Sequence, residues 1–190
     1  LQTEIGQLLD LTSQPIDGKP DLRRFTPSRH AAIVKYKTAF YSFYLPVACG
    51  MILSGIEDPE AFRKAKEICY IMGEYFQVQD DYLDCYGDPK VIGKIGTDIQ
   101  DNKCSWLVVQ ALQRSSKKQQ ELLIESYGKD DEQAVRRVKS LYKDLDLENV
   151  YLDYEQKSYE RLNILIENVD ELIPSAVFRD LLLKIYKREK

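Results

Sequence analysis

The residues best suited to chemistry in this 190-residue sequence are three aspartates at 80, 81 and 84, within the sequence DDYLD. On a helix, Asp80 and Asp84 lie one turn apart with Asp81 beside them, so the three carboxylates crowd one sector of the helix surface. Like charges at this spacing repel by roughly 0.2–0.5 kcal/mol per pair in water, and a bound cation would reverse that sign. Carboxylates that share a metal with substrate phosphates are typical of Mg²⁺, so we predict a magnesium site that Mn²⁺ could also occupy.

A solvated acidic helix face is the alternative interpretation of these aspartates. Apolar and aromatic side chains surround them in the sequence 75–86, which indicates that this helix is largely buried. Buried carboxylates need partners, and this favours the metal site. An EF-hand is excluded because the required Gly and terminal Glu are missing at the needed offsets.

Two lysines downstream could reach a polyphosphate that is held by such a metal. Lys94 lies between Gly93 and Gly96, and Lys103 follows at the start of the next predicted helix. Either lysine alone would be interpreted as a solvated charge. The glycines match neither a P-loop nor a dinucleotide fingerprint. Together, the three aspartates and the two lysines predict a site that binds Mg²⁺ and a diphosphate at one end.

The sequence 38–56 contains no charged residue, and its 19 residues are close to the length that crosses a bilayer. Against a membrane span stand Pro46 and several hydroxyl side chains inside the segment. Thr38, Tyr41 and Ser42 share one helical face. This favours a helix that is buried on all sides within a soluble bundle and contributes hydroxyls to a pocket. This helix would form the apolar end of the site.

Apolar residues recur at helical spacing throughout the chain, so we predict an all-α fold. The sequence Asp58-Pro59-Glu60 is a helix start, with a capping Asp, a proline at the first position and an acid in the first turn. Loops are predicted at 15–20, 87–89 and 91–97. The predicted helices cover 1–11, 31–55, 58–86, 101–114, 119–127, 132–145 and 147–169, with a last one after 175 that ends at 184–190.

The composition excludes several classes of protein. The chain has 27 Lys and Arg against 31 Asp and Glu, a net charge of −4 without basic clusters, so no nucleic-acid partner is expected. Four separated cysteines without a CxxC pair favour a reduced, intracellular compartment. His30 is the one histidine, which excludes a His-rich metal site, and its polar neighbours predict a surface position.

Three sequences, 35–46, 76–84 and 93–106, resemble those of eukaryotic farnesyl diphosphate synthases, and the resemblance extends over the whole chain. It implies an all-helical trans-prenyltransferase of the isoprenoid synthase fold that is normally a homodimer. Such an enzyme condenses dimethylallyl or geranyl diphosphate with isopentenyl diphosphate by ionisation, condensation and elimination. The cysteine usage favours the cytoplasm. The DDxxD form of the motif favours chain elongation over cyclisation.

The resemblance also assigns roles to individual residues. It implies catalytic roles for Lys37, Thr38 and Gln77, where oxygens of Thr38 and Gln77 face the allylic carbon. The implied metal ligands are Asp80, Asp81 and Asp84. The implied binding residues for the diphosphate and the allylic chain are Lys37, Thr38, Tyr41, Gln77, Lys94, Lys103, Asp10 and Arg188. For Arg188, in the basic tail, complementing a helix C-terminus is the alternative role.

Only one DDxxD occurs in the sequence, whereas the resemblance implies a first such motif in an N-terminal half. We therefore expect residues 1–190 to be the C-terminal part of a single polyprenyl synthase domain, and expect the 190 residues alone to be inactive. The alternatives are a truncated or paralogous chain that binds or regulates a full-length synthase, and a purely structural helical protein.

Overall fold

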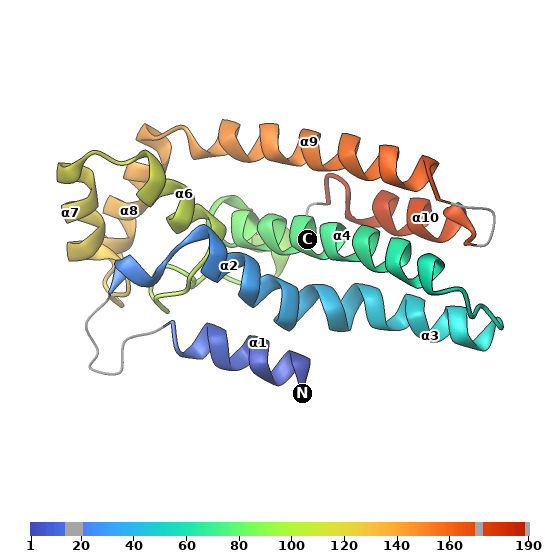
Figure 1. Cartoon of the computed structure of the whole chain (residues 1–190). Helices are drawn as coiled ribbons and strands as arrows, with labels where there is room; N and C mark the ends of the chain where they lie inside the picture. Colours follow the sequence, from blue (N-terminus) through green and yellow to red (C-terminus); the bar gives the residue numbers. More distant parts are fainter. Residues whose placement is uncertain (14–20, 170–172, 189–190) are drawn as a thin grey trace.

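The computed structural model describes residues 1–13, 21–169 and 173–188, and all regular structure in these ranges is helical (Figure 1). The all-α prediction is therefore confirmed. The helices are α1 (Gln2–Leu11), η1 (Leu22–Arg24), α2 (Pro27–Val34), η2 (Lys35–Tyr44), α3 (Leu45–Leu53), α4 (Pro59–Tyr86), α5 (Pro89–Ile92), α6 (Trp106–Arg114), α7 (Lys117–Ser126), α8 (Glu132–Asp144), α9 (Leu147–Glu167) and α10 (Ser175–Ile185).

The 28-residue helix α4 runs through the middle of the molecule and carries the aspartates. It begins as predicted: the Asp58 side chain accepts a hydrogen bond from the Glu60 N–H, and Pro59 takes the first helical position. In Figure 1 the rod formed by α2, η2 and α3 flanks α4 on one side, while α9 and α10 flank it on the other. The long central helix thus holds the aspartates between two layers.

Helices α2, η2 and α3 follow one another without a break, and η2 has π-helical geometry. The predicted start at about residue 31 is wrong, because the Thr26 hydroxyl caps the helix by accepting from the Arg29 N–H. The prediction that 38–56 is buried on all sides is also wrong, since Tyr41 is 57% exposed and Leu53 is 89% exposed. The wider turn of η2 changes which residues share a face, so Thr38 is buried while Tyr41 points outward.

Helix α1 packs directly on η2 and thereby reaches the site. A Cβ added to Gly6 would lie 2.6 Å from Lys37 Cα, so only glycine permits this close backbone approach. Arg29 of α2 fixes the far end of α1, because its guanidinium donates to the Leu9 carbonyl at 2.8 Å and to Ser13 Oγ at 3.1 Å. Asp10, in the last turn of α1, is thus held facing η2.

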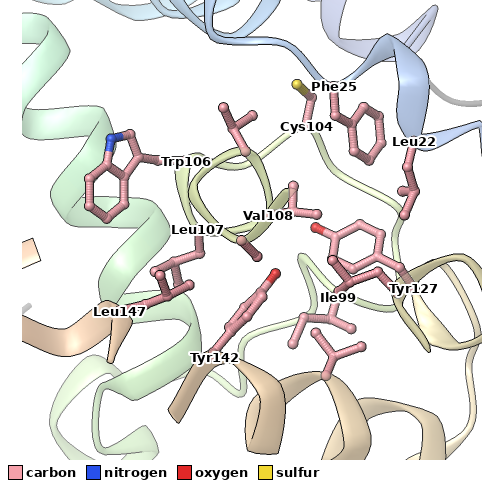
Figure 2. Packing of buried hydrophobic residues seen from close by; sticks show 14 of the residues in the cluster. Leu22, Phe25, Ile99, Cys104, Trp106, Leu107, Val108, Tyr127, Tyr142 and Leu147 are labelled. Carbon is pink, nitrogen blue, oxygen red and sulfur yellow. The ribbon is translucent and has the colours of Figure 1, made fainter. Parts of the chain in front are cut away.

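Two apolar clusters hold the layers together. One surrounds α6 and joins it to α8, α9 and the chain before α6, with Trp106, Tyr127 and Tyr142 among its members (Figure 2). The other lies between α4, α9 and α10 and includes Phe178. Together the clusters fix both flanks of α4.

Several further predicted boundaries differ from the structure. Helix α6 begins at Trp106 rather than 101, because residues 98–102 form turns. The short helix α5 replaces the first part of the loop expected at 91–97, and α10 ends at Ile185. The loop predicted at 15–20 and the chain end at 189–190 lie outside the described residues. Among the described helices, none combines the length and the apolar character that a membrane span requires.

Candidate active site

A cavity of about 120 Å³ lies where α1, α2, η2, α4 and the turns before α6 meet. It brings together residues that are separated by up to 95 positions in the chain, Asp10 and Ser105 among them. Most of its lining is polar or charged. The lining residues are Asp10, His30, Ile33, Val34, Lys37, Gln77, Asp80, Asp81, Asp98, Lys103, Cys104 and Ser105.

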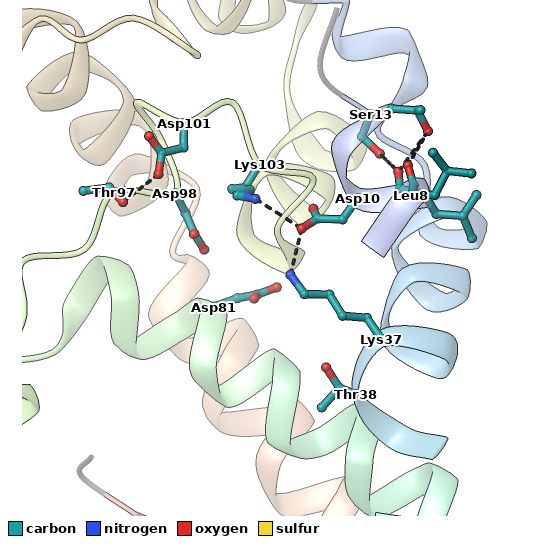
Figure 3. Close-up of polar contacts among 12 residues, drawn as sticks. Leu8, Asp10, Ser13, Lys37, Thr38, Asp81, Thr97, Asp98, Asp101 and Lys103 are labelled. Atoms are coloured by element: carbon teal, nitrogen blue, oxygen red, sulfur yellow. Dashed lines mark hydrogen bonds and ion pairs between the residues drawn. The ribbon is translucent and has the colours of Figure 1, made fainter. Parts of the chain in front are cut away.

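Two of the predicted lysines meet on one buried carboxylate (Figure 3). Lys37 Nζ lies 2.7 Å and Lys103 Nζ 3.1 Å from Asp10 Oδ2. Burial of Asp10 opposes its ionisation, but the hydrogen bonds and charges of Lys37 and Lys103 outweigh burial and hold its pKa below the ordinary value. Two ammonium groups on one carboxylate leave an excess positive charge, which suits a diphosphate.

Thr38, which does not line the cavity, contacts the lining residue Gln77. The Thr38 hydroxyl donates to Gln77 Oε1 at 2.8 Å across the contact between η2 and α4. The Gln77 amide nitrogen donates in turn to Asp81 Oδ1 at 3.0 Å. Two neutral oxygens, from the hydroxyl and the amide, are thereby held side by side where η2 packs on α4.

Asp81 is buried and accepts from three groups. Besides Gln77, its Oδ2 accepts from the Trp106 backbone N–H at 2.6 Å and from His30 Nε2 at 3.0 Å. The predicted surface position of His30 is therefore wrong, since only 6% of it is exposed. The polar residues next to His30 in the sequence do not indicate its burial, because its partner Asp81 lies 51 positions away in the chain.

The other two aspartates of the motif face different surroundings. Asp84 accepts from the backbone N–H groups of Thr97 at 3.3 Å and Asp98 at 3.0 Å, and so fixes the turn that leads to Lys103. Asp80 has a half-exposed side chain, and one of its oxygens lies 3.5 Å from Arg188 Nη2. The three carboxylates thus differ in their surroundings: Asp81 and Asp84 accept from backbone N–H groups, whereas Asp80 is half exposed and contacts Arg188.

The donor set suits Mg²⁺ in one particular way. Among the described residues, no three His, Cys, Asp or Glu side chains are grouped so as to hold a metal ion. Mg²⁺ in phosphate-processing sites, however, takes one or two carboxylates and completes its shell with waters and substrate phosphates. Asp80, open beside two lysines that attract a diphosphate, fits that pattern.

Asp98 is a site residue that the sequence analysis missed. Burial raises its pKa from 3.8 to about 8, and the nearby carboxylates of Asp81, Asp84 and Asp80 add to the shift. Figure 3 shows its side chain directed from the turn region toward Asp81. Its neighbours in the sequence 93–106 carry no sign of burial, because the turns that bury Asp98 are fixed by Asp84.

The raised pKa of Asp98 predicts a pH dependence. Between pH 3.8 and about 8 the folded protein keeps a proton on Asp98 that the unfolded chain has lost, so the free energy of unfolding falls as pH rises through this window. Urea unfolding of the full-length protein in EDTA should show this slope. Asp98→Asn should flatten it, while Asp153→Asn, on the exposed face of α9, should retain it. Equal slopes in both variants and the parent would contradict the assignment.

The C-terminal tail reaches the site through Arg188. Its Nε donates to Gln79 Oε1 at 2.5 Å, and its guanidinium lies 3.8 Å from the Phe76 ring centroid. Gln79 also donates to the Ile185 carbonyl at 3.0 Å and to buried Glu155 at 3.3 Å. The tail is thus anchored on α4 and α9, with its arginine beside Asp80.

Glu155 is the buried acceptor beneath this tail. The hydroxyls of Tyr75 and Tyr151 both donate to its Oε1 at 2.8 Å. We expect Glu155→Gln to lower the free energy of unfolding by about 1 kcal/mol, since hydrogen bonds to a charged acceptor are stronger than those to an amide. Urea unfolding of the full-length protein measures this. Glu160→Gln, exposed on the same helix, is the control, and an equal effect of both changes would contradict the role of Glu155.

Four predicted binding residues do not line the cavity. Thr38 and Arg188 contact the lining residues Gln77 and Asp80, whereas Tyr41 and Lys94 are exposed. Tyr41 lies on η2. Lys94 is exposed in the loop after α5, where its charge opposes the rise in the pKa of Asp84 that burial causes. Tyr41 and Lys94 would contact a substrate only from outside the cavity described above.

The comparisons with known proteins show the family to which this helical chain belongs. Residues 1–145 match the polyprenyl synthetase family, and the chain belongs to that family. It is 57% identical over 189 residues to the human farnesyl pyrophosphate synthase, and 53% identical over 190 residues to the Arabidopsis thaliana mitochondrial farnesyl pyrophosphate synthase 1.

Solved structures extend the likeness to the fold. The farnesyl diphosphate synthase of T. brucei in complex with risedronate has a TM-score of 0.89 and 40% identity, over 100% of this chain and 56% of that chain. The chain therefore has the isoprenoid synthase fold. It spans 45% of the human protein and 49% of the Arabidopsis protein, about half the length of these relatives.

Proposed function

We propose that the full-length protein containing this chain is a Mg²⁺-dependent farnesyl diphosphate synthase. The observation that carries the proposal is the pair of lysines, Lys37 and Lys103, on buried Asp10 beside open Asp80. The similarity to farnesyl pyrophosphate synthases supports the same reaction. The substrates are an allylic diphosphate, either dimethylallyl or geranyl, and isopentenyl diphosphate.

In the proposed reaction, Lys37 and Lys103 bind the diphosphate oxygens of the allylic substrate. Bound Mg²⁺ supplies positive charge that stabilises the leaving diphosphate. The C–O bond breaks with its electron pair going to diphosphate, and the oxygens of Thr38 and Gln77 stabilise the allylic cation. The alkene of isopentenyl diphosphate forms the new C–C bond, and a proton passes to the released diphosphate as the double bond is restored.

The test is turnover of geranyl and isopentenyl diphosphates by the purified full-length protein, with the product identified by mass spectrometry. We expect a fifteen-carbon diphosphate in Mg²⁺ or Mn²⁺ and none in EDTA. The 190 residues alone should give no product. Absence of product from the full-length protein with both metals would overturn the proposal.

The second candidate is a non-catalytic chain that binds or regulates a full-length synthase. The intact pair of lysines on Asp10 would let such a chain hold a diphosphate. In that case the protein would give no product alone but would associate with an active synthase and alter its rate.

We further propose a homodimer in the cytoplasm, following the family resemblance. Analytical ultracentrifugation of the full-length protein should give twice the mass of one chain. Fluorescence microscopy of the tagged protein tests the compartment, and a mitochondrial signal would contradict the proposal. The Arabidopsis relative is named as a mitochondrial protein.

A further inference from the structure

We propose that Asp81 orients Gln77 rather than ligating metal, and that His30 is the positioning residue that holds Asp81 in place. The proposal rests on the proposed function, whose allylic carbon the Gln77 oxygen faces. The three side chains come from α2 and α4, and together they determine which end of the Gln77 amide points into the reaction site.

The first step concerns the carboxylate of Asp81. Its Oδ2 accepts from the Trp106 N–H at 2.6 Å and from His30 at 3.0 Å, and its Oδ1 accepts from Gln77 at 3.0 Å. Both oxygens therefore have strong protein donors, and only 6% of the residue is exposed. Ligating a metal would require Asp81 to leave these donors unpaired in a buried setting, which is costly. Asp80, which is half exposed, has no such obstacle.

The second step concerns the direction of the hydrogen bonds. An ionised carboxylate only accepts, so Gln77 must present its amide nitrogen to Asp81. The amide oxygen then points to Thr38, whose hydroxyl donates to it at 2.8 Å. The reverse orientation would place the amide oxygen against a carboxylate oxygen. The negative charge of Asp81 thus fixes the Gln77 oxygen on the side of the reacting carbon.

The third step concerns His30. By the same rule its Nε2 must carry the proton that Asp81 Oδ2 accepts, so His30 contributes a donor. His30 is buried in α2, and the residue it contacts through this bond is Asp81 rather than a substrate group. Loss of the donor would leave the carboxylate less restrained and the amide of Gln77 less firmly aligned. Misplacement of a positioned group by about 1 Å can cost about 100-fold in rate, so we expect losses of about 10- to 100-fold.

The experiment compares four variants of the full-length protein with the parent: Asp81→Asn, His30→Phe, His30→Gln and Asp80→Asn, the last as the metal-ligand control. For Asp81→Asn we expect kcat to fall about 10- to 100-fold, because the new amide nitrogen must face one of the donors. His30→Phe should lower kcat about 10-fold, and His30→Gln should recover it to within about threefold, since glutamine restores an N–H donor.

The dependence of activity on Mg²⁺ shows whether Asp81 orients Gln77 or ligates the metal. The Mg²⁺ concentration for half-maximal activity, and the calorimetric affinity for risedronate with Mg²⁺, should change less than about twofold in Asp81→Asn and His30→Phe. Both should weaken about 10-fold or more in Asp80→Asn. The double variant His30→Phe with Asp81→Asn should have a kcat no lower than Asp81→Asn alone, because the two residues act through one carboxylate.

Three results would overturn the inference: a metal shift in Asp81→Asn equal to that of Asp80→Asn, an unchanged kcat in His30→Phe, or additive losses in the double variant. Thermal melting reports whether His30→Phe folds, and His30→Gln gives the same comparison with a smaller change of shape. If the parent protein lacks turnover, the proposed function fails, and the calorimetric comparison of Asp81→Asn with Asp80→Asn still decides whether Asp81 ligates metal.

Discussion

Replacing Asp80 by asparagine in the full-length protein is expected to lower kcat by about 10²- to 10³-fold, the loss typical when one charge-stabilising group is removed from a reaction centre. The carboxylate of Asp80 is half exposed and contacts Arg188 Nη2 at 3.5 Å, so it is the member of the motif best placed to take a metal. Asparagine keeps the shape of the side chain and removes its charge.

The same change should leave stability nearly unaltered, because Asp80 contributes no buried ion pair. Steady-state kinetics across Mg²⁺ concentrations and a thermal melt measure the two effects. The matched control is Asp153→Asn, which removes an exposed carboxylate from α9 that pairs with Lys157 at 2.6 Å. An activity loss in Asp80→Asn no greater than that of the control would contradict the assignment of Asp80.

Gly73→Ala is the substitution with the largest expected effect on stability. It should lower the free energy of unfolding by about 3 kcal/mol. A Cβ at this position would fall 2.5 Å from both Cα and Cβ of Ala39, so the backbones of α4 and η2 must move apart. Ala39 adjoins Thr38, and Gly73 lies one turn before Gln77. Separation of the two helices should therefore lengthen the 2.8 Å hydrogen bond from Thr38 to Gln77 and lower kcat as well.

Gly50 provides the control for this substitution. It is an exposed glycine in α3, and a Cβ added there meets nothing within 4 Å. Gly50→Ala should stabilise the protein by about 0.5–1 kcal/mol, because alanine loses less backbone freedom than glycine in a helix. Urea unfolding of both variants gives the comparison, and a Gly73→Ala protein as stable as Gly50→Ala would refute the close packing of α4 on η2.

Local signals in the sequence predict most of the fold. The cap and proline at 58–59 define the start of α4, and the apolar spacing of 147–169 predicts α9 almost to its ends. The resemblance also names lysines and an acid that the fold brings together. Lys37, Lys103 and Asp10 do converge, although they are up to 93 positions apart. Convergence of this kind follows from the family likeness and not from periodicity.

The features that sequence reasoning missed depend on contacts between distant segments. His30 lies in a polar sequence and is nonetheless buried, because Asp81 supplies its partner across the helix packing. Asp98 is buried by turns that Asp84 fixes. The π-helical geometry of η2, which turns Tyr41 outward, has no local signal in the residues 35–44. Roles within the aspartate motif likewise differ because each carboxylate meets a different neighbour.

The most direct test of a Mg²⁺-diphosphate site is a crystal structure of the full-length protein with Mg²⁺ and risedronate, a bisphosphonate that mimics a diphosphate. We predict a metal ion bound to a carboxylate oxygen of Asp80, at the Mg–O distance of about 2.0–2.1 Å that is typical of Mg²⁺. The bisphosphonate oxygens should contact the ammonium groups of Lys37 and Lys103. A bisphosphonate bound away from both lysines, with no metal on Asp80, would contradict the assignment of this cavity as the reaction site.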